Sequence, residues 1–284
     1  RILSSAASDV YKRQIVNTLL ALYQLGLKWN DFNNHNDLQK NLIRSVEHNV
    51  NQFNAQEIAN TLLALYQLGL KWTNFNNHND LQKNLIESVE NNVNQFNRQN
   101  IKILFALIEM RVSINELCIL KLLESINLNF NNIVNDESIS QIGKVLTRIL
   151  LTSYGKDLLN GGKVLANQIK DKKKKVNLEI TKSNLQNDVF RLLKKLDKDI
   201  EMEYKCGIWD CLSVDIYIKN SNTVIEVNGP THFDFNNEYN IKTLRKRELL
   251  IELKFNYIDI PYIDWYGLKN DQEKIVYLKT KLSI

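Results

Sequence analysis

The stretch VIEVNGPTHF, residues 224–233, predicts the central element of the C-terminal third of the chain. Its β-branched start predicts a strand buried on at least one face. The Gly-Pro pair ends that strand, because proline donates no backbone hydrogen bond and glycine tolerates unusual backbone angles. Glu226, Asn228 and His232 therefore stand where a buried strand emerges into a loop, a common position for a functional site. The alternative is a well-packed strand and turn in which the glutamate has no role.

Further elements are predicted on both sides of this strand. Apolar residues spaced at helical intervals predict an amphipathic helix over 183–200, after which 203–205 leads into a turn at 206–207. A strand over 214–218 is joined to the strand at 224–227 by a turn at 221–222. The remaining predicted elements are a basic helix over 239–253, a strand over 255–261 and a terminal helix over 271–282.

The N-terminal half is an internal repeat. Residues 15–57 and 58–100 align at a period of 43, with 36 of 43 positions identical, which marks a helical solenoid. Each copy has two helical stretches, 58–69 and 80–93 in the second copy. Degraded copies begin near Ile101 and Ile142, so we predict an all-α repeat array over 15–151. One helix pair cannot bury its own apolar faces, so several must stack.

Two segments lie outside these regions. Residues 1–14 do not fit the phase of the repeat and resemble a translated junction sequence, so we expect them to be non-native. Residues 152–182 form a predicted basic linker, with a net charge of +4 over 168–182. Lysines in such a run can neutralise phosphates, and a solvated linker is an equally good interpretation.

Composition limits the class of protein. The charge of +5 is a mild basic excess, weak support for an anionic partner. The odd cysteine count, with Cys206 and Cys211 spaced unlike a zinc or redox pair, predicts reduced thiols. No apolar run approaches the roughly 18 residues of a membrane-spanning helix, so no membrane insertion is expected.

The C-terminal third resembles the RAP domain. The resemblance rests on VDI at 214–216, IEVNGPTHF at 225–233, the Thr243…Lys246 helix, and IPYIDW at 260–265. The stretch IANTLLALYQLG at 58–69 resembles octotricopeptide-like helical repeats, and repeats ahead of a RAP module are the usual layout in FAST-kinase-like, organellar and bacterial RNA-binding proteins. The resemblance implies a multidomain chain: an all-α solenoid, then an α/β RAP module over 183–284 with a small restriction-endonuclease-like sheet flanked by helices.

This resemblance implies binding of single-stranded RNA and a role in transcript or rRNA processing, stabilisation or translation. In such families the solenoid selects the RNA and the RAP module contacts it. The alternative for the basic helix is an ordinary solvated face. The expected RNA-binding residues are Asn228, His232, Phe233, Lys242, Arg245, Lys246, Arg247, Lys172, Lys173, Lys174 and Lys175.

A second function follows from the likeness of RAP domains to PD-(D/E)xK nucleases. By that comparison Asp215 and Glu226 would hold Mg²⁺ beside a scissile phosphate. Asn228 stands where the nuclease pattern has lysine, and Lys246, or Lys242, is the substitute on the following helix. No cofactor is expected otherwise. For Trp265 we expect packing under the sheet rather than stacking on a base.

A third hypothesis is a protein-interaction scaffold or a secreted bacterial effector, since solenoids also bind proteins. Abundant Asn, Lys and Ile with only two prolines indicate an AT-rich genome. The mitochondrial or plastid matrix and the bacterial cytoplasm are therefore all open as locations.

Overall fold

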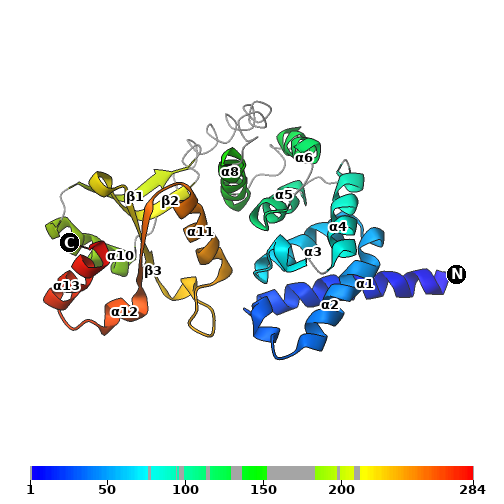
Figure 1. Cartoon of the computed structure of the whole chain (residues 1–284), viewed down its shortest axis with the longest axis horizontal. Coiled ribbons are helices and arrows are strands. Elements are labelled where there is room, and N and C mark those ends of the chain that lie inside the picture. Colours follow the sequence, from blue (N-terminus) through cyan, green and yellow to red (C-terminus); the bar gives the residue numbers. More distant parts are fainter. Residues whose placement is uncertain are drawn as a thin grey trace. The chain divides into compact units, whose positions relative to one another are not determined.

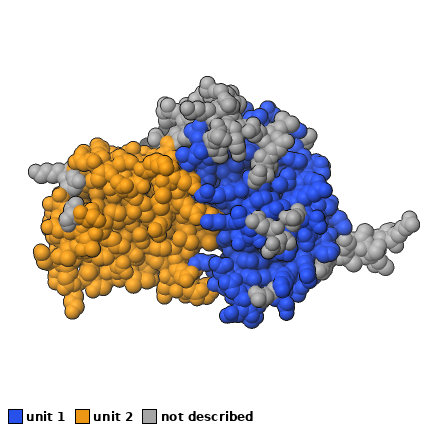
Figure 2. Space-filling model, in the orientation of Figure 1, with its two compact units in different colours: residues 1–168 blue, residues 169–284 orange. Residues whose placement is uncertain are grey.

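The structure is a computed structural model that divides into two compact units, residues 1–168 and 169–284 (Figure 2). Each unit has its own core. The described residues are 2–75, 78–93, 95, 99–112, 116–128, 136–151, 183–196, 199–207 and 212–283. The lysines at 172–175 and Cys211 lie outside the described residues.

The N-terminal unit is all-helical, as predicted (Figure 1). Helix α1 contacts α3, α3 contacts α5, and α5 contacts α8, while α2 packs on α4. The helices are α1 (Ile2–Gln24), α2 (Asn36–Asn49), α3 (Ala55–Gln67), α4 (Asn79–Asn92), α5 (Gln99–Glu109), α6 (Glu116–Leu128) and α8 (Asp136–Leu150). Residues 2–14, which we expected to be foreign to the repeat, are helical and continuous with its first helix.

Local sequence explains where the repeat helices begin and end. Asn54 caps α3 by accepting a hydrogen bond from the Glu57 backbone N–H at 3.0 Å, and the Glu57 side chain accepts the Asn54 N–H at 2.9 Å. This reciprocal capping box satisfies two N–H groups that lack helical partners. At the other end Gly69 has φ 86°, a left-handed angle at which glycine carries no penalty. Helix α3 therefore begins after a capping asparagine and ends just before a glycine.

The C-terminal unit is a four-stranded mixed sheet flanked by helices (Figure 1). Its strands lie in the order β1–β2–β3–β4, antiparallel except for the parallel pair β3–β4. A parallel pair needs a crossover connection, and the helix α11 lies in it. The elements are α10 (Asn184–Leu196), β1 (Ile200–Cys206), β2 (Leu212–Ile218), β3 (Thr223–Asn228), α11 (Ile241–Glu252), β4 (Asn256–Pro261), α12 (Tyr262–Gly267) and α13 (Asp271–Leu282).

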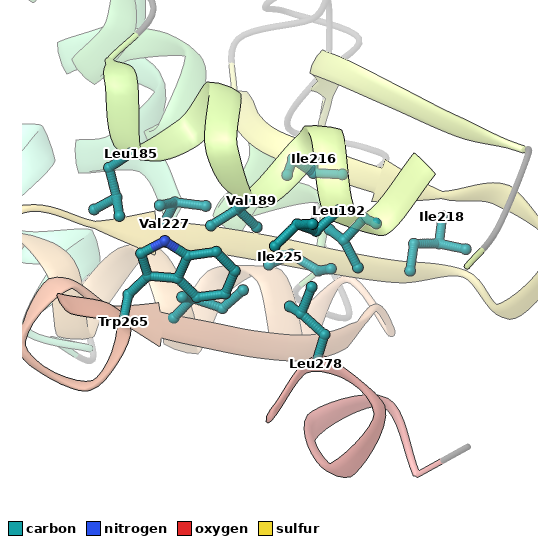
Figure 3. Close-up of a cluster of buried hydrophobic side chains, with 11 residues drawn as sticks. Leu185, Val189, Leu192, Ile216, Ile218, Ile225, Val227, Trp265 and Leu278 are labelled. Carbon is teal, nitrogen blue, oxygen red and sulfur yellow. The ribbon is translucent and has the colours of Figure 1, made fainter. Parts of the chain in front are cut away.

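Helices cover both faces of this sheet. On one face α10, α12 and α13 enclose a core around Ile225, Val227 and Trp265 (Figure 3). On the other face Leu249 and Leu250 of α11 pack on Val224 and on β2. All six residues of β3 are buried, because the strand is central and covered on both sides. The predicted buried strand is thus confirmed, and Trp265 packs in the core as expected.

The strand β1 corrects the sequence prediction. Residues 183–200 were predicted as one helix followed by a connection, but α10 ends at Leu196 and residues 200–206 pair with β2. Ile200, Met202, Tyr204 and Cys206 alternate with polar residues, the period of a strand. The pattern was present, but it is short and follows directly on a strong helical period.

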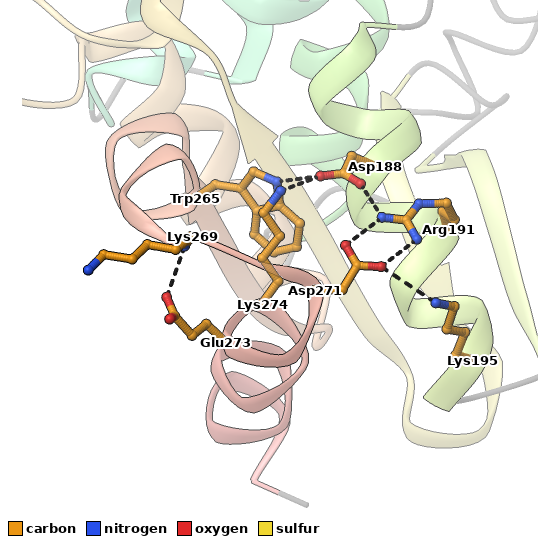
Figure 4. Close-up of polar contacts among 8 residues, drawn as sticks. All are labelled: Asp188, Arg191, Lys195, Trp265, Lys269, Asp271, Glu273 and Lys274. Atoms are coloured by element: carbon orange, nitrogen blue, oxygen red, sulfur yellow. Dashed lines mark hydrogen bonds and ion pairs between the residues drawn. The ribbon is translucent and has the colours of Figure 1, made fainter.

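Charged side chains link α10 to α12 and α13 (Figure 4). The carboxylate of Asp188 accepts hydrogen bonds from Trp265 Nε1 at 3.0 Å, Lys274 Nζ at 2.8 Å and Arg191 at 2.7 Å. Arg191 also donates two hydrogen bonds to Asp271, at 2.8 and 2.9 Å. Burial raises the pKa of Asp188, but these hydrogen bonds outweigh it and leave the pKa lowered.

Two predictions from composition can be compared with the described residues. Cys118 and Cys206 are both buried, at 5% and 6% exposure. Burial raises the pKa of the Cys118 thiol to about 11, so this thiol is protonated and unreactive at neutral pH. Among the helices of the described part of the chain, none is long and apolar enough to cross a bilayer.

Candidate nucleic-acid interface

The parallel strands β3 and β4 end at the same edge of the sheet. Asn228, the last residue of β3, is in register with Pro261, the last residue of β4. The segment 229–240 leaves the sheet from the first strand and α12 from the second. In sheets of this kind, ligands bind outside the carboxyl ends of parallel strands, because the connecting segments converge there.

Aromatic side chains gather at this edge. The ring of Phe233 stacks on Tyr239 at 4.6 Å between centroids and meets Tyr262 edge-on at 5.5 Å. Phe235 lies between the stacked pair in sequence and is 60% exposed, and Tyr266, one turn beyond Tyr262 on α12, is 67% exposed. We call Phe233, Phe235, Tyr239, Tyr262 and Tyr266 the aromatic edge.

The segment that carries Phe235 is held by its own hydrogen bonds. One carboxylate oxygen of Asp234 accepts the backbone N–H groups of Asn236 at 2.9 Å and Glu238 at 3.0 Å, an arrangement that fixes a tight turn. Asn240 donates to the Thr231 carbonyl at 2.8 Å and also caps α11. The exposed aromatic ring is therefore presented by a turn that is already organised.

Behind the aromatic edge lies a buried ion pair. Lys246 Nζ of α11 is 2.6 Å from Glu226 Oε2 of β3, and the side chains are 26% and 3% exposed. Burial raises the pKa of Glu226 to about 7, with a further increase from Asp215 and an opposing decrease from Lys246. Burial lowers the pKa of Lys246, but the neighbouring carboxylates outweigh it and leave the pKa raised. Each partner thus needs the other to stay charged.

Asp215 lies beside this pair, as the hairpin spacing predicted. Its Oδ2 accepts the Val227 backbone N–H at 2.6 Å, and its Oδ1 accepts the Gln186 side chain at 2.5 Å. The ladder between β2 and β3 includes no pair beyond Ile216 and Ile225, so the Asp215 carboxylate takes the place of a backbone partner. These contacts give it a structural role.

The same contacts bear on the nuclease hypothesis. Both oxygens of Asp215 are hydrogen-bonded and Glu226 Oε2 is paired with Lys246, whereas Glu226 Oε1 is buried without a hydrogen-bond partner among the described residues. The described residues contain no group of three or more His, Cys, Asp or Glu able to hold a metal ion. The Mg²⁺ site at Asp215 and Glu226 stays a prediction, which a cleavage assay tests.

The predicted RNA-binding residues divide into exposed and buried ones. Lys242 and Arg247 are exposed on α11, and the Arg247 guanidinium lies 5.4 Å from the Tyr257 ring centre. Arg245 is buried and 2.9 Å from Glu248, so it does not belong to the exposed basic face. Asn228 is fully buried and does not form a surface contact either. In both cases the position of the residue on its helix or strand turns the side chain inward.

The exposure of His232 is intermediate between that of the exposed and the buried residues. The side chain is half-buried, and its Nδ1 is 3.1 Å from the hydroxyl of Thr243. Burial lowers the pKa of His232, so the ring is neutral at pH 7. A neutral ring of this kind offers a hydrogen bond rather than a charge.

Sequence reasoning missed three aromatic residues of this surface: Phe235, Tyr239 and Tyr266. Their common feature in the sequence is that they follow the ends of two predicted strands, 224–227 and 255–261. The structure places those two strands side by side as the parallel pair β3–β4.

Comparison with known proteins supports this division of the chain. The RAP domain family matches residues 225–281, which span most of β3, all of α11, β4 and α12 and most of α13, and include the aromatic edge. A protein family of unknown function (DUF1601) matches residues 26–62 and 76–101, within the two repeat copies. The search of the curated proteins found no match to the chain. The chain therefore carries a RAP domain over residues 225–281, behind an all-helical N-terminal region.

Proposed function

We propose that the C-terminal unit binds single-stranded RNA across the aromatic edge, and that the protein acts in post-transcriptional RNA metabolism. The observation that carries the proposal is the exposure of Phe235 and Tyr266 at the carboxyl edge of β3 and β4. The presence of a RAP domain is consistent with RNA binding. Bases stack on exposed aromatic rings, each stack contributing about 1–3 kcal/mol.

Cations near this edge supply the contacts to phosphate. Lys242 is exposed in the first turn of α11, directly after the segment that carries Phe235. Lys246, one turn further, keeps part of its side chain exposed. Stacking platforms combined with flanking cations are the usual basis for binding single strands without strict sequence preference. In this proposal the helical unit adds selectivity for particular transcripts.

The test is a fluorescence-anisotropy titration of the full chain with a mixed single-stranded RNA pool at two salt concentrations. We expect submicromolar binding that weakens steeply with salt, because neutralised phosphates release counterions. Absent or salt-insensitive binding would contradict the proposal. A protein partner that survives nuclease treatment would instead favour the scaffold hypothesis.

Single substitutions test which side chains contact the RNA. Phe235→Ala and Tyr266→Ala are each expected to raise Kd by about 5- to 150-fold, the equivalent of one lost stack. The matched control is Ile251→Ala, which removes an exposed apolar side chain near the other end of α11, away from the carboxyl edge. Equal effects of all three variants would show that the aromatic edge is not the binding surface.

Lys242→Ala is expected to weaken binding at low salt and to reduce the slope of log Kd against log salt by about one. Its control is Lys219→Ala, since Lys219 lies between β2 and β3 at the opposite edge of the sheet. An unchanged salt slope in Lys242→Ala would remove this lysine from the interface.

The endonuclease hypothesis is decided in the same titration. RNA recovered after incubation with Mg²⁺ or Mn²⁺ is sized on a gel. Intact RNA supports a binding role. Shortened RNA, with the shortening abolished in Asp215→Ala, would establish cleavage.

A further inference from the structure

Identical residues of the two repeat copies have different exposure. Leu25 is 70% exposed, whereas Leu68, its equivalent in the second copy, is 1% exposed. Leu38 is 42% exposed and its equivalent Leu81 is 0% exposed. The local sequence is the same in both copies, so the difference comes from what packs against each copy.

The exposed residues form one surface on the first copy. Thr18 and Ala21 of α1 and Leu25 directly after it are spaced at helical intervals, and all three are exposed, as is Leu38 of α2. Their equivalents in the second copy are all buried: Thr61, Ala64, Leu68 and Leu81. We call Thr18, Ala21, Leu25 and Leu38 the end face.

The structure shows what covers these positions in the second copy. The Trp29 backbone N–H donates to the Leu68 carbonyl at 2.8 Å. The Glu47 carboxylate of α2 accepts the Leu81 backbone N–H at 3.2 Å, at the start of α4. The first copy thus covers the second through a tryptophan segment and the helix that follows it.

The same kind of contact recurs at the next junction. Trp72, the equivalent of Trp29, donates its backbone N–H to the carbonyl of Met110 at 3.0 Å, at the end of α5. The repeat therefore carries its own means of covering the neighbour that follows it. Each copy offers one face with a tryptophan segment and an opposite face that such a segment covers.

We infer that the end face is a docking surface for one further helix pair of this 43-residue repeat, stacked as the first copy stacks on the second. The apolar character of Ala21, Leu25 and Leu38 suits the same type of partner, because the equivalents Leu68 and Leu81 are buried and hydrogen-bonded to that partner in this molecule. Exposing two leucines and an alanine to water is unfavourable, and stacking removes them from it.

The test compares the full chain with an extended chain in which a second copy of residues 15–57 is inserted directly before Ile15. We expect hydrogen exchange across residues 18–27 to slow in the extended chain until it matches the exchange of the equivalent residues 61–70. Exchange that stays at the rate of the parent chain would overturn the inference, as would failure of the extended chain to gain helical signal.

A substitution series sharpens the test. Leu25→Asp is expected to shift Tm of the helical unit by less than about 1 °C in the parent chain, where the side chain is exposed. In the extended chain the same change is expected to lower Tm by about 5 °C or more, because it buries a charge in the new junction. Lys40→Asp is the control, since Lys40 and its equivalent Lys83 are both exposed. A Leu25→Asp substitution that leaves the Tm of the extended chain unchanged would overturn the inference.

Sedimentation of the parent chain tests whether a second copy of this chain occupies the end face instead. We expect a monomer whose mass is unchanged by Leu25→Asp. A dimer that Leu25→Asp dissociates would show that a second copy of this chain occupies the end face, and would replace the inference.

Discussion

Replacing Lys246 with methionine is expected to destabilise the C-terminal unit by about 3 kcal/mol at pH 8 and by much less at pH 5. The substitution removes the ammonium at 2.6 Å from Glu226 and leaves a buried carboxylate without its counter-ion. Methionine keeps most of the volume of the lysine stem, so lost packing contributes little. The expected loss is therefore electrostatic.

The sign of the pH dependence follows from the pKa of Glu226. Burial already raises this pKa to about 7 from an ordinary value of 4.5, and losing Lys246 removes an influence that lowers it. A carboxyl group with a raised pKa binds its proton more tightly in the folded chain than in the unfolded chain. The stability of the variant therefore falls as pH rises through the pKa of the folded state. Below about pH 4.5 the carboxyl group is protonated in both states and the deficit disappears.

The measurement is urea unfolding followed by hydrogen exchange of β3 amides, at pH 5 and pH 8. Lys242→Met is the control, an exposed cation four residues earlier on α11, and it is expected to change stability by less than about 0.5 kcal/mol. An equal loss in Lys246→Met at the two pH values would show that Glu226 is not the cause.

Replacing Trp265 with alanine is expected to destabilise the C-terminal unit by about 3–5 kcal/mol, the largest effect of a single substitution considered for this unit. Trp265 is among the largest fully buried side chains, and it fills the space between α10 and the sheet (Figure 3). Alanine leaves a cavity there, because packed helices relax only partly around a lost ring.

The polar end of Trp265 adds to this loss. Its Nε1 donates to Asp188 Oδ2 at 3.0 Å, within the network that ties α10 to α13 (Figure 4). Trp265→Phe keeps a ring but removes the donor, while Lys274 and Arg191 still bond to Asp188. This variant is expected to lose about 1–2 kcal/mol, between the parent and Trp265→Ala.

Both losses are measured by hydrogen exchange of the β3 amides in the full chain. Tyr266→Ala, at an exposed position on the same helix, is the matched control and should stay within about 0.5 kcal/mol. That control also verifies that the binding variant is folded. A loss below about 1 kcal/mol in Trp265→Ala would mean that the core repacks around the missing ring.

The order of elements in the C-terminal unit was largely predictable from the sequence. The run at 224–227 predicted β3 because its residues are apolar and β-branched. The predicted terminal helix over 271–282 has the bounds of α13, because Asn270 caps it and its apolar spacing is helical. The strand β1 was missed, since a short alternation next to a strong helical period has little weight.

The candidate site was predictable only in part. The proximity of Asp215 and Glu226 followed from the hairpin that joins their strands. The contacts that Gln186, Val227 and Lys246 make with these carboxylates join distant segments, and no local pattern encodes them.

The repeat period, the two kinds of unit and the central strand were predictable from the sequence, because these depend on local periodicity. Which side chains are exposed to water depended on the tertiary structure. It buried Arg245 and Asn228, exposed Phe235 and Tyr266 at one edge, and gave Leu25 and Leu68 opposite environments despite their identical neighbours in sequence. Exposure depends on what packs against a residue from elsewhere in the chain, so identical local sequences can have different surroundings.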